Sequence, residues 1–209
     1  MDRRDRLAGF TLIELLIVIS IIALLAVVLL PEIVGSKEAA NEAATQADMI
    51  RLDTGAKTFG NKRGYFPPDD LKSPEGGAAA TWKPDNGQNT GIESLVAFVS
   101  QSQQDGIDLS GMGEKLTNTD KDDHGAELPM LHTKERKEVS DPWGTPLCYF
   151  SKFGMEKTQS VTVGDQDPMP VKAHKNANGT FRGAGKFQIL SAGRDMIFGT
   201  GDDLCWPDN

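Results

Sequence analysis

The sequence predicts an α+β protein in which one long N-terminal helix packs on a small domain of antiparallel strands. An unbroken apolar run, 10–30, leads into a polar segment, 31–59, whose alanines recur at helical spacing. The remainder, 60–209, carries short apolar segments between glycine- and proline-rich turns, which is typical of strands. The helix is therefore expected to have a transmembrane half and an amphipathic half, with the globular domain after it.

The apolar run is long enough to cross a membrane. As a helix, about 21 residues measure about 31 Å, and the hydrocarbon core of a bilayer is about 30 Å thick. Arg3, Arg4 and Arg6 precede the run, and such a cluster predicts a cytoplasmic N-terminus. An ordinary secretory signal fits less well, because its apolar stretch has only about 7–15 residues before a cleavage site.

Glu14 is the acidic residue of this run. A carboxylate at the centre of a bilayer costs about 2.5–3.5 kcal/mol, and less near the interface, so it usually indicates a function and a partner. A plain signal anchor would explain the length of the run and the arginines. It would leave Glu14 unexplained.

A short motif opens the run: Gly9-Phe10-Thr11-Leu12-Ile13-Glu14. It resembles the processing site of the type IV prepilin family, in which a basic leader ends in glycine. The resemblance implies that a prepilin peptidase removes residues 1–9 by cleaving between Gly9 and Phe10, and that Phe10 is then N-methylated. The helix at 10–30 stays in the mature protein, first as a membrane anchor and then as a filament core.

The same resemblance gives Glu14 a role in assembly. Cleavage creates a positively charged amine on Phe10, and in this family that amine lies near the glutamate of a neighbouring subunit. Each charge would then relieve the other in an apolar environment. Pro31 lies where the family commonly has a helix-interrupting proline. Together with Gly35 and Ser36, it predicts a bend or local melting of the helix.

The amphipathic half is expected to run to about Phe59, with Gly55 weakening its last turns. Small residues recur there at spacings of three and four, and such a stripe allows close approach of the domain or of neighbouring helices. The stripe consists of Ala39, Ala40, Ala43, Ala44, Ala47, Ile50 and Thr54.

Three segments of the globular domain, 60–209, resemble the major pseudopilins of type II secretion. They are a turn at 61–67, a short helix at 91–99 and the sequence from Asp141 to Phe150, in which Trp143 is expected to be a core aromatic. The chain departs from that family over 72–90 and over about 100–139, and the second stretch is interpreted as an insertion. Strands are predicted at 160–163, 171–174, 180–182 and 186–191, with a hairpin turn at Asn178-Gly179.

The loop at 191–205 is the candidate metal site. It holds Asp195, Asp202 and Asp203 among several glycines, and hard oxygen ligands in a flexible loop suit calcium. The spacing is not that of an EF-hand, and a solvated turn is the alternative. The resemblance implies a structural calcium ion, because major pseudopilins have this aspartate spacing. They usually have glycine where this chain has Met196.

Two further features leave alternatives open. Cys148 and Cys205 could form one disulfide outside the cytoplasm, or they could be two unpaired thiols. An acidic stretch suggests a second cation site, although a solvated loop is the stronger expectation: Asp120, Asp122, Asp123 and His124.

The net charge of −8 argues against nucleic-acid binding as a main role. No nucleophile elbow, P-loop, His-Glu-x-x-His or Cys-x-x-Cys motif occurs, so no enzymatic activity is expected. A membrane-anchored enzyme or binding module is kept as a remote alternative.

The resemblance implies a structural subunit of a periplasmic pseudopilus that drives protein export by type II secretion. Such a subunit is a single-pass protein of the inner membrane with its C-terminal domain in the periplasm. Its expected partners are copies of itself, the prepilin peptidase, the inner-membrane secretion platform and minor pseudopilins. The alternative is a type IV pilin or minor pilin of a surface fibre for adhesion, motility or DNA uptake, whose C-terminal region is typically closed by a disulfide.

Overall fold

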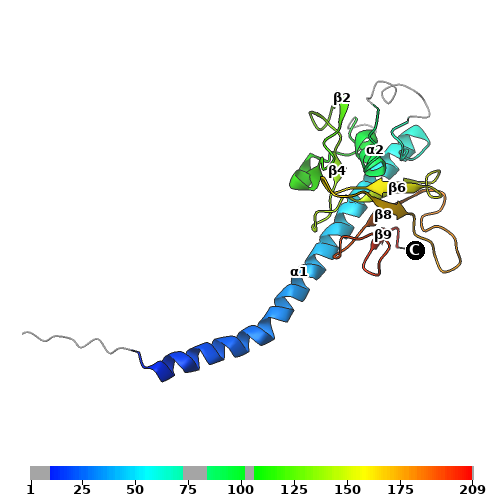
Figure 1. Cartoon of the computed structure of the whole chain (residues 1–209). Coiled ribbons are helices and arrows are strands. Elements are labelled where there is room, and N and C mark those ends of the chain that lie inside the picture. Colours follow the sequence, from blue (N-terminus) through cyan, green and yellow to red (C-terminus); the bar gives the residue numbers. More distant parts are fainter. Residues whose placement is uncertain (1–9, 73–83, 102–105, 209) are drawn as a thin grey trace, which may run out of the picture. The chain divides into compact units, whose positions relative to one another are not determined.

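The computed structural model describes residues 10–72, 84–101 and 106–208 (Figure 1). The chain divides into two compact units, Met1–Ala40 and Asn41–Asn209. The long helix α1, Leu12–Arg63, belongs to both. Gly9 and the rest of the predicted leader lie outside the described residues.

The first unit contains the apolar part of α1. Its most apolar 18-residue window has a mean hydropathy of 3.2 and is fully exposed within the chain. Length and composition thus suit a membrane-spanning helix, as predicted. A bend or local melting was expected at Pro31 and Gly35, and the melting does not occur, because the helix is continuous through both. One proline removes a single backbone hydrogen bond, which the rest of a long helix can tolerate.

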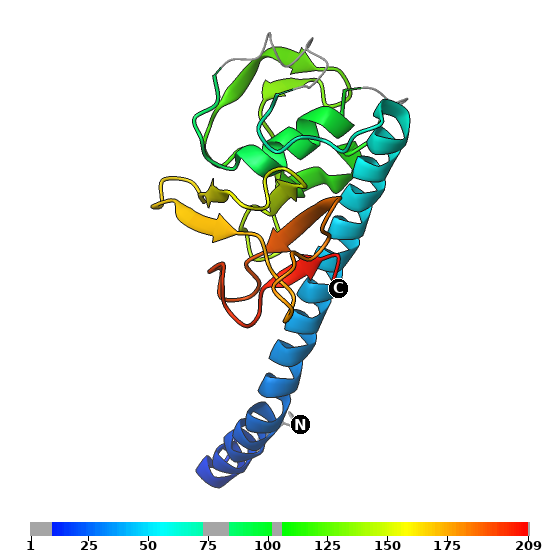
Figure 2. The same cartoon turned by 90° about the vertical axis from the view of Figure 1, so that its right-hand side faces the viewer.

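In the second unit, α1 packs on the globular domain with a face other than the stripe of small residues, so of the two expected contacts of that stripe the domain is excluded and neighbouring helices remain. The predicted stripe of small residues is exposed except for the half-buried Ala44. The buried face carries larger apolar side chains, Met49, Leu52 and Phe59, which remove more apolar area from water. Figure 2 shows this half of α1 running alongside the strands of the domain.

Helix α1 ends at Arg63, later than the predicted Phe59. Gly64 follows with a φ of 78° and donates its N–H to the Gly60 carbonyl at 2.8 Å. Gly55 has a packing role, because a Cβ there would lie 3.0 Å from Ile107 Cγ1. A glycine that was expected to weaken the helix instead allows a close contact.

The main core lies between α1, helix α2 and a three-stranded antiparallel sheet. Helix α2 is Thr90–Val99, and the sheet has the order β5-β8-β9, with β5 at Cys148–Ser151, β8 at Phe187–Ser191 and β9 at Leu204–Trp206. Every residue of α2 after Thr90 is buried. A second antiparallel pair, β6 (Thr158–Val161) and β7 (Met169–Lys172), encloses a smaller core. These elements confirm the predicted α+β architecture.

The stretch interpreted as an insertion has its own structure. A 3-10 helix at Ser110–Lys115 precedes two antiparallel pairs, β1–β4 and β2–β3. The strands are short: β1 is Leu116–Thr117, β2 Asp123–Leu128, β3 Thr133–Glu135 and β4 Glu138–Val139.

Polar contacts fasten this stretch to α1. Lys115 Nζ lies 2.6 Å from Asp48 Oδ2, and Arg51 Nη2 donates to the Asp108 carbonyl at 2.8 Å. The stretch is therefore part of the packed domain.

Two predictions about turns have mixed outcomes. Asn178-Gly179 forms the expected turn, with Gly179 N donating to Asn176 O at 2.9 Å, but only an isolated bridge at Phe181 replaces the strand predicted at 180–182. Trp143 is half-buried and lies outside the core clusters. The buried residue of its turn is Asp141, whose Oδ1 accepts hydrogen bonds from the backbone N–H groups of Trp143 and Thr145.

Candidate functional site

The N-terminus of α1 is closed by a reciprocal pair of contacts between Thr11 and Glu14. The Thr11 backbone N–H and hydroxyl both donate to Glu14 Oε2 at 2.8 Å, and the Glu14 N–H lies 3.3 Å from Thr11 Oγ1. This is a capping box, in which an N-cap residue and the third helical residue satisfy each other's backbone donors. Phe10, the predicted methylation site, lies next to it and is 87% exposed.

The capping box places the Glu14 carboxylate at the start of the helix, where its negative charge is stabilised. The carboxylate lies in the first turn of the helix, where unpaired N–H groups and the positive end of the helix dipole stabilise negative charge. It is not an isolated charge in the middle of an apolar run. Sequence reasoning missed Thr11, although the Thr-x-x-Glu spacing before an apolar helix is a recognisable signal.

Glu14 and Pro31 do not form a single site within one chain. They are separated by 17 positions of a continuous helix, which corresponds to about 25 Å at about 1.5 Å per residue. Any joint role in assembly must therefore act at different places along the helix.

The predicted metal loop is folded tightly on itself. Asp202 Oδ2 accepts the Asp195 N–H at 3.0 Å, and Thr200 Oγ1 donates to Asp202 Oδ1 at 2.6 Å. Hydrogen bonds from Thr200 and from the Asp195 N–H hold the pKa of Asp202 below its ordinary value. Met196 has a φ of 58°, so the position where the family resemblance implies glycine is indeed left-handed here.

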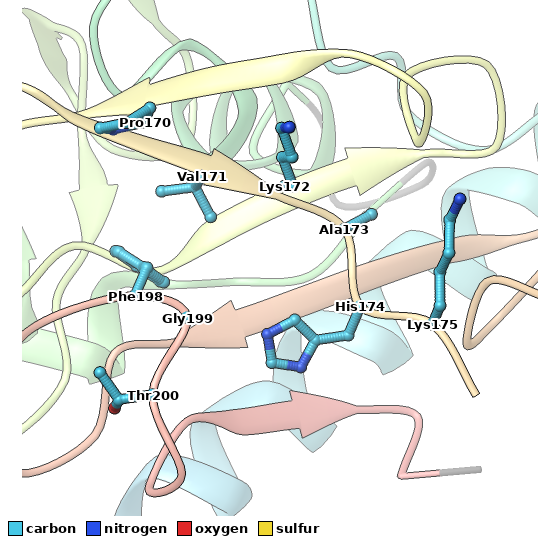
Figure 3. Close-up of a pocket in the computed structure, with 9 residues that line it drawn as sticks. All are labelled: Pro170, Val171, Lys172, Ala173, His174, Lys175, Phe198, Gly199 and Thr200. Carbon is cyan, nitrogen blue, oxygen red and sulfur yellow. The ribbon is translucent and has the colours of Figure 1, made fainter. Parts of the chain in front are cut away.

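Asp203 lies beneath the loop and beside His174. Its side chain is 1% exposed, and its Oδ2 lies 3.0 Å from His174 Nε2 and accepts the Gly199 N–H at 2.7 Å. Figure 3 shows His174 pointing into a pocket between the segment after β7 and loop residues Phe198 to Thr200. The pocket has a volume of about 610 Å³.

The donor chemistry of the loop fits calcium, because Asp195, Asp202 and Asp203 supply only carboxylate oxygens. Their arrangement is more open than the close set of oxygens that a calcium ion needs. Within the described residues, the three do not form a set whose oxygens all lie within 4.8 Å of one another. The loop brings the predicted ligands into one turn but holds them through backbone N–H groups.

Cys148 and Cys205 are both buried and free, so the disulfide is not formed and the two-thiol alternative holds. The strand register gives the reason. Cys148 pairs with Leu190 of β8, and Leu190 pairs with Cys205 on its other side. Two strand spacings amount to about 9–10 Å, whereas bridged cysteines have Cα atoms within about 7 Å.

Comparisons with known proteins agree with the N-terminal geometry. Residues 4–30 match the family described as the prokaryotic N-terminal methylation motif. The type II secretion system core protein G of Escherichia coli K12 is 23% identical over 204 residues, covering 98% of this chain and 93% of that protein. The core protein G of Dickeya chrysanthemi is 39% identical over 54 residues, which are 26% of this chain and 34% of the relative.

No solved structure matches the chain. The sequence matches therefore carry the assignment: one covers the apolar helix, and another extends over nearly the whole chain. The chain thus carries a prokaryotic N-terminal methylation motif at residues 4–30 and is similar to core protein G of type II secretion systems.

Proposed function

We propose that this chain is a structural subunit of a periplasmic pseudopilus, a filament that assembles through the N-terminal helix and drives protein export by type II secretion. The observation that carries the proposal is the position of the methylation motif. It lies at the start of an exposed apolar helix, in a chain similar to core protein G over nearly its full length. Homology to these structural proteins also points to a non-enzymatic role.

Before assembly, the helix anchors the subunit in the inner membrane with the globular domain in the periplasm. The apolar side chains of the first unit then exchange lipid for neighbouring helices. Their exposure within the single chain supports this step, since Leu24 and Val27, for example, are 67% and 73% exposed. A surface of this size does not stay in water.

Assembly pairs Glu14 with the amine of Phe10 in the next subunit. The capping box supports the geometry of this step, because it holds the Glu14 carboxylate at the extreme N-terminus of the helix, beside Phe10. A neighbouring helix displaced along the filament would bring its own amine to this carboxylate. Prepilin peptidase, the inner-membrane secretion platform and minor pseudopilins are the further partners of the proposed pathway.

Processing can be tested directly. The full-length chain is co-expressed with a prepilin peptidase, and the mass and N-terminal sequence of the product are measured. Cleavage before Phe10 with one added methyl group is expected, and Gly9→Leu serves as the uncleaved control. A chain that keeps residues 1–9 in the presence of active peptidase would refute the assembly model.

Export separates the two filament classes. Deletion of the gene is expected to block secretion of folded proteins without loss of surface fibres. Loss of surface fibres with normal export would instead establish the type IV pilin alternative. The disulfide that would have favoured that alternative is absent, because both cysteines are free.

The loop at 191–205 is the second part of the proposal. Asp195, Asp202 and Asp203 would hold a structural calcium ion, which stabilises the folded domain because only the folded state binds it. The all-oxygen donor set and the tight turn at Gly193, with a φ of 67°, support this role. EDTA should lower the melting temperature of the wild type, and Asp202→Asn should reduce this effect. Equal responses of the two proteins would exclude the site.

A further inference from the structure

A buried glutamate lies in the core of the domain, and no hydrogen-bond donor contacts it among the described residues. Glu93, in the first turn of α2, is 0% exposed. Neither of its carboxylate oxygens has a hydrogen-bond partner within the part of the chain that the structure describes. An isolated ionised carboxylate is very costly in a protein interior, so this side chain requires a compensating group.

The groups nearest to Glu93 are other carboxylates. Oxygens of Asp85, Glu93 and Asp122 lie within 4.8 Å of one another, and so do oxygens of Glu93, Asp120 and Glu138. Glu93 belongs to both sets. We call these five residues the Glu93 cluster.

In three of the surrounding carboxylates, one oxygen accepts a hydrogen bond and the other has no hydrogen-bond partner among the described residues. Thr119 Oγ1 donates to Glu138 Oε1 at 2.6 Å, and Asn86 Nδ2 donates to Asp120 Oδ2 at 2.9 Å. Arg136 Nη1 donates to Asp122 Oδ2 at 2.6 Å. The second oxygen of each is buried and unpartnered among the described residues: Glu138 Oε2, Asp120 Oδ1 and Asp122 Oδ1.

The cluster has five carboxylates, and the fully buried guanidinium of Arg136 contacts two of them. Arg136 bridges Asp85 and Asp122 and is 0% exposed, so the cluster keeps a large excess of negative charge if its acids are ionised. Either protons or a cation must therefore balance the charge.

The free oxygens match the needs of a calcium ion better than those of shared protons. Calcium takes about six to eight oxygen ligands at about 2.3–2.6 Å. Two ligands on opposite sides of one ion are then up to about 5 Å apart, and the carboxylate oxygens within each of the two sets lie no farther from one another than that. Five unpartnered buried oxygens belong to the cluster, two from Glu93 and one each from Asp120, Asp122 and Glu138.

We propose that the Glu93 cluster binds a calcium ion that joins α2 to the stretch carrying β1 to β4. Helix α2 packs against β4 (Figure 1), so Glu93 and Glu138 come from adjoining elements. A pocket of about 360 Å³ is lined by Asp120, a member of the cluster, and by Thr119. This site is separate from the loop at 191–205 and does not depend on filament assembly.

The experiment uses the full-length chain in detergent, stripped of metal with EDTA, in which Asp195, Asp202 and Asp203 are all replaced by Asn. This background removes the ligands proposed for the loop. Isothermal titration with calcium, and separately with magnesium, then measures the remaining site. One calcium ion per chain is expected, with weaker binding of magnesium.

Glu93→Gln in this background should weaken calcium binding by about tenfold or more, since even outer-shell partners of a metal ion contribute that much. Glu156→Gln, which changes an exposed glutamate, is the matched control and should bind as the parent does. Glu93→Gln should also raise the melting temperature in EDTA while abolishing the calcium-induced rise, a combination that a purely structural defect would not give.

If Glu93→Gln does not fold, Asp120→Asn replaces it, because Asp120 is only half-buried. Circular dichroism verifies its fold before titration. The proposal is overturned if the background chain binds no calcium, if magnesium binds equally well, or if the cluster variant that folds binds calcium like Glu156→Gln.

Discussion

The carboxylate of Glu14 and the backbone N–H of Thr11 lie 2.8 Å apart, and the Glu14 N–H returns the contact to the Thr11 hydroxyl. The acid at the start of the apolar helix thus has a function in the single chain, as half of a capping box. In a filament the same oxygen would also face the amine of a neighbouring Phe10. Helix capping and the proposed charge pairing would then be two roles of one side chain, and substitutions can separate them.

Glu14→Gln should insert into the membrane but fail to form filaments. Glutamine can complete a capping box, so the helix start is preserved while the negative charge is lost. Thr11→Ala has the opposite effect: it loses an N-cap hydroxyl, typically worth about 0.5–2 kcal/mol, but keeps the charge. Sheared filament yield, normalised to membrane-inserted protein, distinguishes them. Equal yields from the two variants would contradict a charge-specific role.

Met196→Gly is expected to stabilise the domain slightly. Met196 has a φ of 58°, and left-handed backbone costs a residue with a Cβ about 1–2 kcal/mol. Glycine avoids that cost but loses about 0.5–1 kcal/mol through its greater freedom in the unfolded chain. The net gain should be about 1 kcal/mol or less, measured by thermal unfolding with and without EDTA. Gly199→Ala, at a φ of 92°, should destabilise the same loop.

The two cysteines should behave as buried thiols under all redox conditions that keep the protein folded. A reductant should leave the melting temperature unchanged, because Leu190 lies between the two residues in the sheet. Thiol titration should count two reactive groups after denaturation and fewer before it. A reductant-dependent shift in melting temperature would show that the sheet register is wrong.

The buried carboxyl of Asp69 should make the free energy of unfolding decrease as the pH rises above 3.8. Its carboxylate accepts the Ser151 hydroxyl at 2.9 Å, but burial raises the pKa of Asp69 above its ordinary value of 3.8. The folded state then binds more protons than the unfolded state just above pH 3.8, so this contribution to stability falls as the pH rises through that window. Asp69→Asn has no titrating carboxyl at this position and therefore lacks this pH-dependent contribution to stability.

Chemical unfolding across that window measures the effect. The free energy of unfolding of the wild type, relative to Asp69→Asn, should decrease as the pH rises from 3.8 toward the raised pKa. Asp70→Asn, at a neighbouring position where the carboxylate is half-exposed, is the control. A difference that is constant with pH would mean that the carboxyl is not desolvated.

The sequence predicted the elements that rest on local patterns. The long helix followed from an apolar run and a helical period, and α2 followed from apolar residues spaced as in a helix. The turn at Asn178-Gly179 followed from a dipeptide that favours left-handed backbone. These signals lie within a few residues of one another, so no tertiary information was needed.

The misjudged features depend on tertiary structure. The face of α1 that packs on the domain is decided by Met49, Leu52 and Phe59, which compete with the alanines at the same period and bury more apolar area. Periodicity alone cannot rank the two faces. The choice between a disulfide and two free thiols stayed open for a related reason, since only the strand order shows that a strand lies between the cysteines.

The Glu93 cluster combines residues that are recognisable in the sequence with a convergence that only the tertiary structure reveals. An acid in the largely apolar helix 90–99 and three aspartates within 120–123 were each visible in the sequence. Their convergence was not, because it depends on how the stretch with β1 to β4 folds back on α2.

Glu93 and the stretch that follows α2 must consequently be changed together when the domain is redesigned. The acceptors around Glu93 come largely from residues 118–138. A shortened domain without that stretch would leave a bare carboxylate on an apolar helix. Trimming should succeed only when Glu93 is replaced by an apolar residue in the same step, and a graft of the stretch onto a relative should require a glutamate at the corresponding helical position.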